Sequence, residues 1–371
     1  MEAEATKVVI AGAGFAGTEA AQALSALVRG RNVQITMVSD RSYHLFTPLL
    51  YQVASGLANS YHVIQPVRGW AVRKRIAFLE ATVNAVDIQR KAIETDRGVL
   101  NYDFLVLCLG SETNDFGMPG VSEKALFLKK LEDVVAIRNR ILRCFEAASL
   151  HAKPESERRR LLSTVIVGGG SSGVELAGTI ADYFGALGEY YEGIGTDRSA
   201  RVSLIEAEGK LVPGLGDSIS ETCLRVLRRK GVDVRLNAKV ASVDADGIRL
   251  RDGTSITTYT VVWTAGIKPN RVIAGLSVDG SESRGGRLVV DRQLRLRSAP
   301  GVYVIGDCAY IEDGKGGAVP ATAAAAVQEG RFVARHMAYG ILGGRRGGEM
   351  VFGYRDGASC CRWAGLRALR A

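Results

Sequence analysis

The chain has 371 residues, of which 47% are hydrophobic and 23% are charged. This composition predicts two or three domains with apolar cores and excludes a mainly disordered chain. The formal net charge is +9. The Lys and Arg residues are scattered, however, and form no basic stripe with interleaved aromatic residues, so we expect no nucleic-acid binding.

The N-terminal stretch and the cysteines indicate where the protein works. The first residues are acidic and soon reach a glycine-rich stretch, unlike a signal peptide, and no apolar run reaches the roughly 20 residues of a membrane-spanning helix. The six cysteines form no CxxC pair and fit neither a zinc site nor a disulfide framework. Cys108 and Cys308 lie in apolar runs and are expected to be small buried hydrophobic residues. We therefore expect a reducing, cytosolic compartment and no metal site.

A strand predicted at residues 8–11 leads into the stretch GAGFAG. This stretch places Gly12, Gly14 and Gly17 in GxGxxG spacing before a helical pattern. Such glycines permit a tight turn, a close approach of a pyrophosphate to the backbone, and tight packing of the helix on the strand. The next predicted strand ends near Asp40, whose carboxylate can accept hydrogen bonds from ribose hydroxyls. Together these features predict a dinucleotide-binding fold.

The same pattern recurs after residue 160. A predicted strand precedes Gly168, Gly170 and Gly173, a helix follows, and the next strand closes at Glu206. A carboxylate at Glu206 favours the free 2′-hydroxyl of NAD(H) and repels the 2′-phosphate of NADP(H). Each glycine set alone could be a tight turn of an α/β protein, but the two sets together predict two dinucleotide sites.

Three later stretches, residues 102–112, 260–270 and 301–309, are predicted to return to these sheets. The last leads into Gly306-Asp307, where the carboxylate can bind a sugar-alcohol hydroxyl or, alternatively, cap the next helix. The predicted fold is α/β, with two Rossmann-like dinucleotide-binding domains, the second inserted into the first. The expected order is a first domain over 1–115, a connecting helix and charged linker over 116–160, the inserted domain over 161–280, the return of the first domain over 281–340, and a tail over 341–371.

Several stretches resemble one family, in the right order and from residue 7 to about 340. They are YHLFTPLLYQVASG (43–56), FLVLCLGSETNDFGMPGV, FLKKLEDVVAIRNRIL, VIVGGGSSGVELAG, LIEA, VVWTAG, YVIGDCA and ATAAAAVQEG. The chain thereby resembles the type II NADH dehydrogenases, single-chain NADH:quinone oxidoreductases of the flavoprotein disulfide reductase superfamily. The resemblance implies non-covalent FAD in the first domain, NADH as substrate in the second, a quinone as acceptor, and no proton pumping.

The resemblance also implies roles for individual residues. FAD is assigned to Gly12, Gly14, Phe15, Ala16, Gly17, Asp40, Arg41, Pro48, Val83, Gly110, Gly306, Asp307, Ala323 and Ala324. NADH is assigned to Gly168, Gly170, Ser171, Ser172, Gly173, Glu206, Ala265 and Gly266. Glu175 becomes a residue on the nicotinamide side, or alternatively a favourable charge in the first turn of its helix.

On the acceptor side, the resemblance places Gln328 facing the quinone. It places residues 43–56 along the flavin and the floor of the quinone pocket, where His44 can reach a carbonyl edge. Aromatic and aliphatic side chains suit such flat, apolar rings. A buried loop beside the sheet would explain the apolar residues of this segment as well.

The absence of a cysteine pair in residues 40–60 bears on the path of the electrons. The disulfide-reducing branch carries a redox cysteine pair that residues 40–60 lack, so electrons are expected to pass from the flavin directly to the acceptor. A helix predicted from near Thr322 would aim its first amides at the flavin and stabilise negative charge there. Other activities stay open: a soluble NADH-dependent reductase of small quinones or other acceptors, a flavoprotein kept for binding, and a sulfide:quinone oxidoreductase-like enzyme using Cys144.

Two departures from the family pattern affect the acceptor side. Where the family has a second Gln four residues before Gln328, this chain has Ala324, which removes a polar contact to quinone. After Asp356 the pattern is lost, and an Arg-rich tail of about four helical turns stands where an amphipathic membrane-binding region is expected. We expect a cytoplasmic protein, or one weakly associated with the cytoplasmic face of the inner membrane, and a homodimer stays open.

Overall fold

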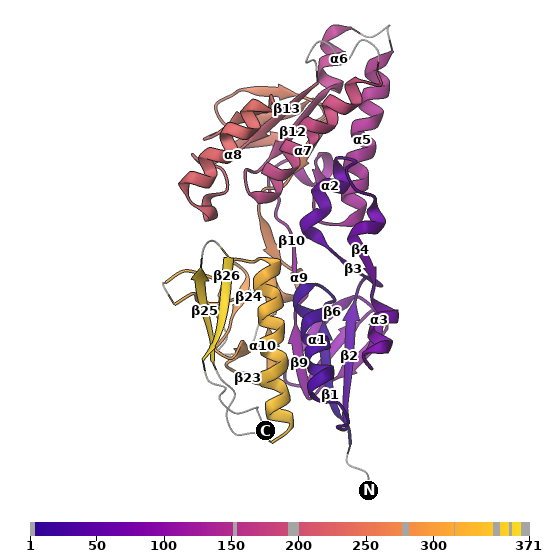
Figure 1. Ribbon diagram of the computed structural model, residues 1–371, viewed down its shortest axis with the longest axis vertical. Coiled ribbons are helices and arrows are strands. Elements are labelled where there is room, and N and C mark those ends of the chain that lie inside the picture. The colour runs from indigo at the N-terminus through magenta and orange to yellow at the C-terminus, as the bar shows by residue number, and fades with distance from the viewer. Residues whose placement is uncertain are drawn as a thin grey trace. The chain divides into compact units, whose positions relative to one another are not determined.

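A computed structural model describes residues 4–150, 154–191, 200–276, 282–314 and 316–343, and the backbone alone of 349–355 and 358–364. The chain divides into two units (Figure 1). The first unit comprises residues 1–44, 65–112 and 268–371, and the second comprises residues 45–64 and 113–267. Two strand pairs lie where the chain passes from one unit to the other: β3 (Tyr43–Leu45) with β4 (Ile64–Pro66), and β10 (Ser111–Thr113) with β19 (Ile267–Pro269).

The first unit is built on a six-stranded sheet. In sheet order its strands are β22 (Arg295–Leu296), β23 (Ala299–Val304), β9 (Phe104–Leu107), β1 (Thr6–Ala11), β2 (Val33–Ser39) and β5 (Ala77–Glu80). All neighbours pair in parallel except β22 and β23. Ile10, Leu107 and Val304 are fully buried, as expected where helices or loops cover both faces of a parallel sheet. The predicted strand at residues 8–11 is confirmed.

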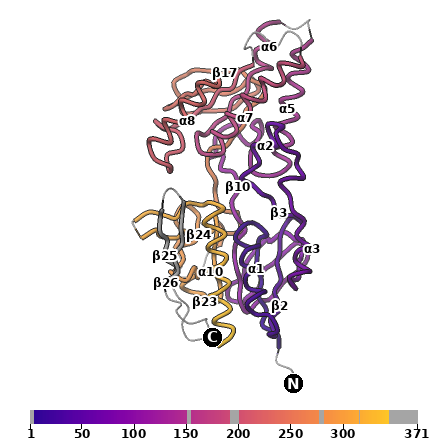
Figure 2. The backbone as a smooth tube through the Cα atoms, in the orientation of Figure 1, coloured from indigo at the N-terminus to yellow at the C-terminus, as the bar shows by residue number. Residues whose placement is uncertain are grey.

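Two helices from opposite ends of the chain lie side by side in this unit, α1 (Phe15–Leu27) in indigo and α10 (Ala323–Ile341) in orange (Figures 1 and 2). A Cβ placed on Gly330 of α10 would lie 2.5 Å from the carbonyl oxygen of Ala16. The two backbones therefore approach more closely than any side chain at residue 330 would allow. The helix begins as predicted, with Thr322 as its N-cap accepting a hydrogen bond from the amide of Ala325.

Smaller elements complete the first unit. They are α3 (Val67–Arg73), α9 (Arg271–Ala274), η4 (Gly306–Cys308), the antiparallel sheet of β6 (Val83–Asp87), β7 (Ala92–Thr95) and β8 (Gly98–Asn101), and the sheet of β20 (Ser283–Arg284), β21 (Arg287–Val289) and β24 (Ala309–Tyr310).

The end of the chain forms a strand pair. β25 (Glu349–Arg355) and β26 (Ala358–Ala364) are antiparallel, with Glu349 opposite Ala364. The tail was predicted as about four helical turns, which is wrong for these residues because they form strands. Asp356 and residues 365–371 lie outside the described residues.

The second unit is built on a five-stranded sheet in which all neighbours pair in parallel. In sheet order its strands are β11 (Leu126–Phe127), β18 (Thr260–Trp263), β12 (Ser163–Val167), β13 (Arg201–Ile205) and β14 (Asp233–Arg235). Its helices are α2 (Leu50–Ala54), α4 (Val121–Lys124), α5 (Leu131–Ser149), α6 (Glu155–Leu161), α7 (Ser171–Gly188) and α8 (Asp217–Arg229). An antiparallel sheet of β15 (Val240–Val243), β16 (Gly247–Leu250) and β17 (Ser255–Thr257), and the short turns η1 (Thr47–Leu49), η2 (Ser60–Val63) and η3 (Pro213–Leu215), complete it.

The second unit takes in two segments that the predicted boundaries placed elsewhere, residues 45–64 and 113–160. In the first of them, α2 buries Leu50, Val53 and Ala54 and packs against α5 and α7. In the second, α5 is amphipathic as predicted, but its buried face packs on β11 and β18 and is part of a core. The predicted connecting helix and linker (116–160) therefore belong to the second unit, where α5 covers the sheet. The local sequence pattern alone does not show this.

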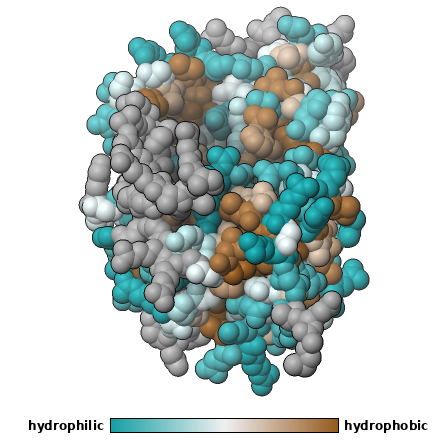
Figure 3. Space-filling view, turned by 60° about the horizontal axis from the view of Figure 1, so that its bottom comes forward, coloured by the Kyte–Doolittle hydropathy of each residue, from teal (hydrophilic) through white to brown (hydrophobic). Residues whose placement is uncertain are grey.

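Figure 3 shows one face of the molecule, on which apolar patches, in brown, lie among hydrophilic residues. In residues 45–64, Phe46 is 42% exposed, Leu57 61% and Tyr61 64%. Among the described residues, no helix combines the length and the apolarity that crossing a bilayer requires.

The close approach of α10 to α1 predicts opposite effects of adding one methyl group at two glycines of the same helix. Gly330→Ala places its Cβ against the Ala16 backbone, and overpacking of this kind lowers the free energy of unfolding by about 2 kcal/mol. Gly340→Ala is the matched control, because no atom lies within 4 Å of its Cβ position. Its better helix propensity should leave stability unchanged or raise it by about 1 kcal/mol. Urea unfolding of both variants measures the difference, and equal effects would contradict the packing described.

Candidate functional site

The first glycine turn joins β1 to α1 in the first unit. Gly12 has φ +126°, and a Cβ there would lie 2.2 Å from the carbonyl oxygen of Cys108. A Cβ on Gly17 would lie 2.0 Å from the carbonyl oxygen of Gly12. Gly14, between them, has nothing within 4 Å of its Cβ position. Two glycines are thus needed by the fold itself, whereas the middle one faces open space at the start of a helix. A helix N-terminus of this kind is suited to an anion.

The predicted acid and the two further glycine turns of the first unit follow strands of the same sheet. Asp40 comes directly after β2, Gly110 follows β9, and Gly306-Asp307 follows β23. Because β1, β2, β9 and β23 are parallel, these residues meet at one edge of the sheet, beside the glycine turn. The turns are also bonded to one another: Ser111 Oγ donates to Asp307 Oδ2, and the thiol of Cys308 donates to the Gly110 carbonyl oxygen.

Arg41 leaves a buried donor at this edge. Its Nε lies 3.3 Å from Asp40 Oδ1. Its Nη1 is buried and has no hydrogen-bond partner among the described residues. An unsatisfied buried guanidinium nitrogen is costly, so its position indicates a missing acceptor. Val83, the other predicted residue of this region, is buried at the start of β6.

The first turn of α10 contains Ala323 and Ala324, as predicted from the helix start at Thr322. The first amides of a helix have no carbonyl partner within it, and they carry partial positive charge. Gln328 is half-buried, and its Nε2 donates to the Ala324 carbonyl oxygen at 3.0 Å. The chain therefore brings Gln328 and Ala324, the two positions of the family's glutamine pair, into direct contact.

Glu329 is a buried acid that the sequence analysis missed. Its side chain is 3% exposed, and its Oε2 accepts a hydrogen bond of 2.6 Å from the amide of Gly306. Burial raises the pKa of Glu329 to about 7, the Gly306 hydrogen bond opposes this, and the charge of Asp307 adds to it. A sign was present in the sequence: Glu329 falls on the same helix face as Ala325, Ala326 and Val333, which is otherwise apolar.

The second glycine turn, from β12 to α7 in the second unit, repeats the geometry of the first. Gly168 has φ +112°, and a Cβ there would lie 2.7 Å from the amide of Ala265. A Cβ on Gly173 would lie 1.9 Å from the carbonyl oxygen of Gly168, whereas Gly170 has nothing within 4 Å. Ser171 and Ser172 are exposed at the start of α7. Ala265 and Gly266 follow β18, so the structure brings them to this turn as predicted from sequence order.

Glu206 directly follows β13 and is tied to the second glycine turn. Its Oε2 accepts from the amide of Gly169 at 2.5 Å, and its Oε1 accepts from the amide of Glu208 at 2.7 Å. The carboxylate is half-buried and retains further acceptor positions, since an ionised carboxylate has about four. The two hydrogen bonds thereby fix the carboxylate beside the glycine turn.

Glu175 does not lie in the first turn of its helix, where the alternative interpretation placed it as a favourable charge. α7 begins at Ser171 and has no acidic residue in its first turn. Glu175 stands in the second turn, where attraction to the helix N-terminus has largely faded. Its side chain reaches solvent, yet partial desolvation raises the pKa of its carboxyl above the usual value. A favourable charge at the helix N-terminus therefore does not explain Glu175. Its role on the nicotinamide side stays a prediction.

The segment 43–56 is divided between the two units. His44 belongs to the first unit, and its Nδ1 lies 3.0 Å from the carbonyl oxygen of Ala13 in the glycine turn. Pro48 lies in η1 of the second unit and is exposed, so the geometry of the first unit does not test its predicted role. Packing accounts for the apolar residues of α2, in agreement with the alternative of a buried loop. It does not account for the apolar character of Phe46, which lies before α2 and is exposed.

Three cysteines of the described residues are poorly suited to redox chemistry. Cys108, Cys144 and Cys308 are buried, as predicted for Cys108 and Cys308. Burial raises the pKa of each of the three thiols, which lowers the reactive thiolate fraction. This argues against Cys144 as a sulfide-reactive group. Within the described residues, no group of three or more His, Cys, Asp or Glu side chains is arranged to hold a metal ion.

The chain is similar to known oxidoreductases over most of its length. Residues 6–330 match the family model described as pyridine nucleotide-disulphide oxidoreductase. A type II NADH:quinone oxidoreductase, NdhA, of Mycobacterium tuberculosis is 34% identical over 351 residues, which cover 90% of this chain and 72% of that protein. A probable NADH dehydrogenase of Dictyostelium discoideum is 31% identical over 340 residues, covering 90% of this chain and 73% of that protein.

A solved structure shares the fold. NDH2 from Plasmodium falciparum, in complex with NADH, superimposes with a TM-score of 0.82 at 21% sequence identity, covering 90% of this chain and 83% of that chain. The predicted α/β fold with Rossmann-like sheets is thus confirmed.

Burial of Glu329 predicts a stability that depends on pH. The carboxyl titrates near 4.5 when unfolded and near 7 when folded, so the folded chain binds more protons between these values. The free energy of unfolding should therefore fall by about 3 kcal/mol as pH rises through this window. Glu329→Gln keeps an acceptor for the Gly306 amide and should abolish this slope, whereas Glu312→Gln, at an exposed carboxylate, should keep it. Chemical unfolding from pH 4.5 to 8 measures both, and a slope that survives in Glu329→Gln would refute the assignment.

Proposed function

Because the chain belongs to the type II NADH:quinone oxidoreductases, within the pyridine nucleotide-disulphide oxidoreductase family, we propose that it oxidises NADH through bound FAD and reduces a quinone without pumping protons. The observation that carries the proposal is the repeated glycine turn. Each unit has one at the end of a parallel strand, each is packed against backbone atoms at two glycines, and each leaves open space at the middle one. One chain is therefore built to hold two dinucleotides.

FAD fits the first unit. The open space at Gly14 and the start of α1 would take the pyrophosphate, with Phe15 and Ala16 in the first turn. Asp40 would accept from the adenosine ribose, and the unpartnered Nη1 of Arg41 would find its acceptor on the same part of the cofactor. Asp307 would hold the sugar-alcohol chain. When bound, FAD accepts a hydride and passes on two electrons.

The protein's own residues would prepare this site for negative charge. The amides of Ala323 and Ala324 open α10, and a helix N-terminus stabilises an anion by about 0.3–1 kcal/mol or more in a partly buried site. Glu329 holds the Gly306 amide from below and thereby orients the turn that carries Asp307. Ser111 orients Asp307 from the other side.

NADH fits the second unit in the same way. Gly170, Ser171 and Ser172 would receive its pyrophosphate at the start of α7, with Ala265 and Gly266 beside them. Glu206 would accept a hydrogen bond from the 2′-hydroxyl of the adenosine ribose. A 2′-phosphate would meet the same carboxylate and be repelled. Glu175, one turn into α7, would serve the nicotinamide side.

Quinone and membrane contacts are proposed on exposed apolar residues. Phe46 and Leu57 are exposed in residues 45–64. They offer apolar contacts to a flat ring. In the first unit, Gln328 is proposed separately as a polar contact to the quinone. We propose that residues 45–64 also meet a membrane surface on the cytoplasmic side. A homodimer is compatible with this arrangement.

A visible spectrum and an anaerobic NADH titration test the proposed function directly. The purified protein should be yellow, contain one releasable FAD, and bleach on addition of one equivalent of NADH. A short-chain quinone should then restore the oxidised spectrum. A protein that stays colourless after reconstitution with FAD, or that NADH does not bleach, would rule the function out.

The position of Glu206 predicts the choice of nicotinamide cofactor. Glu206→Gln removes the charge that repels a 2′-phosphate while keeping an acceptor near the Gly169 amide. The preference for NADH over NADPH, measured as the ratio of kcat/KM values, should fall by about 10-fold, the effect of one charge in a partly buried site. Glu208→Gln is the matched control, because its exposed side chain is not bonded to the turn, and it should leave the ratio unchanged. Equal use of both cofactors by the unaltered protein would contradict the role of Glu206.

A further inference from the structure

Phe116 is an exposed aromatic residue with a backbone conformation that bulky residues rarely adopt. Its φ is +54°, in the left-handed region, where the Cβ atom crowds the backbone. The residue is 61% exposed, so burial of its ring does not offset this strain. Strained residues persist where the surrounding structure holds them, and they cluster at ligand sites. A role toward a ligand would account for both the strain and the exposure.

Hydrogen bonds of Asn114 hold Phe116 in this conformation. The Phe116 amide donates to Asn114 Oδ1 at 2.9 Å. The Asn114 amide donates to the carbonyl oxygen of Gly266 at 3.2 Å. The carbonyl oxygen of Asn114 accepts from Trp263 Nε1 at 2.9 Å, and Trp263 is only 2% exposed. The loop is therefore anchored in the core of the second unit, although Phe116 itself is at the surface.

The ring of Phe116 lies against Gly266. A Cβ on Gly266 would lie 2.6 and 2.9 Å from two atoms of this ring, so only glycine leaves room for the ring at its present position. The preceding residue, Ala265, has its amide 2.7 Å from the Cβ position of Gly168 in the second glycine turn. All four residues belong to the second unit. The structure thus fixes an exposed aromatic ring beside the second glycine turn.

The strand order of the second sheet shows which half of a dinucleotide would meet this ring. β18, β12 and β13 are neighbours and run parallel. Gly266 follows β18, the glycine turn follows β12, and Glu206 follows β13, so Gly266 and Glu206 lie on opposite sides of the turn. A dinucleotide bound at such an edge has its pyrophosphate at the glycine turn and its adenosine ribose at the acid. The other half, which carries the nicotinamide, then extends toward β18 and Phe116.

We propose that Phe116 is the stacking platform for the nicotinamide ring of NADH. This inference rests on the proposed function and adds to it a residue that positions the reacting ring. Flat rings attract one another in offset stacks, and a ring that rests on Phe116 by one face keeps its other face free. Phe116 makes and breaks no bond in the reaction, and its contribution is to bind and orient the ring.

Ligands with and without the nicotinamide ring test this role. ADP-ribose is NADH without that ring, and in protein whose flavin has been reduced beforehand both ligands bind without reacting. Phe116→Ala should weaken NADH binding by about 10-fold, as expected for loss of one aromatic stack, and leave ADP-ribose binding unchanged. Tyr190→Ala is the matched control, because Tyr190 is 80% exposed and follows the end of α7 that is remote from the turn. It should leave both affinities unchanged in calorimetric titrations.

Two further variants separate the ring of Phe116 from its backbone. Asn adopts the left-handed conformation more readily than Phe, so Phe116→Asn should be at least as stable to urea as the unaltered protein and still bind NADH about 10-fold more weakly. Phe116→Tyr keeps the ring and should keep the affinity. An unchanged NADH affinity in Phe116→Asn, or an ADP-ribose affinity that falls equally, would overturn the proposal. An unaltered protein that binds neither ligand would instead refute the proposed function.

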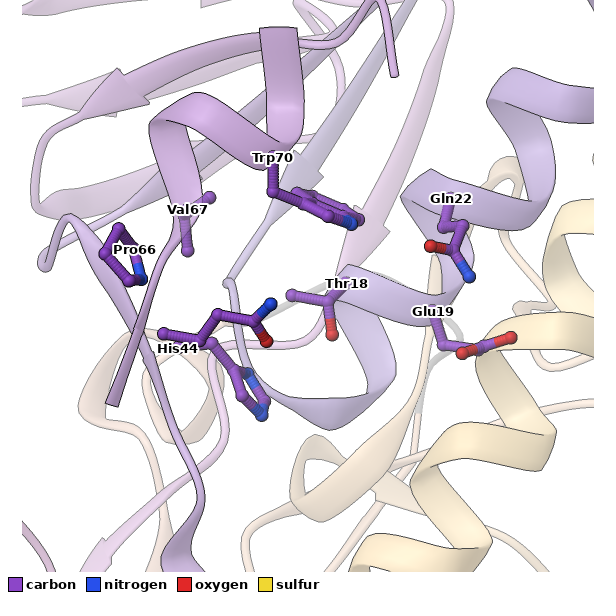
Figure 4. Close-up of a pocket in the computed structure, with 8 residues that line it drawn as sticks. Thr18, Glu19, Gln22, His44, Pro66, Val67 and Trp70 are labelled. Atoms are coloured by element: carbon purple, nitrogen blue, oxygen red, sulfur yellow. The ribbon is translucent and has the colours of Figure 1, made fainter. Parts of the chain in front are cut away.

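Trp263, directly beneath the loop, can report where the nicotinamide lies. Of the other two tryptophans, Trp70 lines a cavity of the first unit together with Thr18 and Gln22 of α1 (Figure 4), and Trp363 is in β26. Trp70→Phe and Trp363→Phe therefore isolate the Trp263 signal without altering the second unit. Because dihydronicotinamide absorbs tryptophan emission, saturating NADH should quench Trp263 more strongly than saturating ADP-ribose. Equal quenching by the two ligands would mean that the nicotinamide lies away from the loop, and would overturn the proposal.

Discussion

The structure depends on two backbone contacts that only glycine permits. Gly17 lies against the carbonyl oxygen of Gly12, and Gly173 lies against that of Gly168, at distances where a Cβ would clash. Each contact draws the start of a helix onto the end of a strand, so that the first helix amides face the open position of the middle glycine. A methyl group at Gly17 or Gly173 would push the helix away and disrupt the proposed ligand site together with the packing.

A third contact of this kind extends the site. Gly330 lies against the Ala16 carbonyl oxygen, which brings α10 down onto the first turn of α1. Glu329 is then held beneath the turn after β23, where it accepts the Gly306 amide. A bulkier residue at 330 would displace the helix, leaving this amide without its acceptor. The position of Asp307 thus depends on a glycine of α10 whose packing partner, Ala16, lies near the opposite end of the chain.

Local pattern was enough to predict the two glycine turns, the acids after β2 and β13, and the start of α10 at Thr322. Each of these needs only a few neighbouring residues, since strand, turn and cap are local structures. Residues 45–64 were misassigned because apolar side chains do not show which core will bury them. Glu175 was placed one turn too early, since a helix boundary is uncertain by a residue or two. Glu329 and the contact of His44 with Ala13 arise only when segments distant in sequence meet.

Glu206 and Glu329 make the same kind of hydrogen bond in different surroundings. Glu206 and Glu329 both accept the amide of a glycine turn, at 2.5 and 2.6 Å. Glu206 also accepts a second amide and is only half-buried, which supports its proposed role in distinguishing a hydroxyl from a phosphate. Glu329 is 3% exposed, and burial raises its pKa to about 7. The surroundings, and not the hydrogen bond itself, therefore decide which carboxyl can face a ligand, as proposed for Glu206, and which is desolvated inside the fold, as for Glu329.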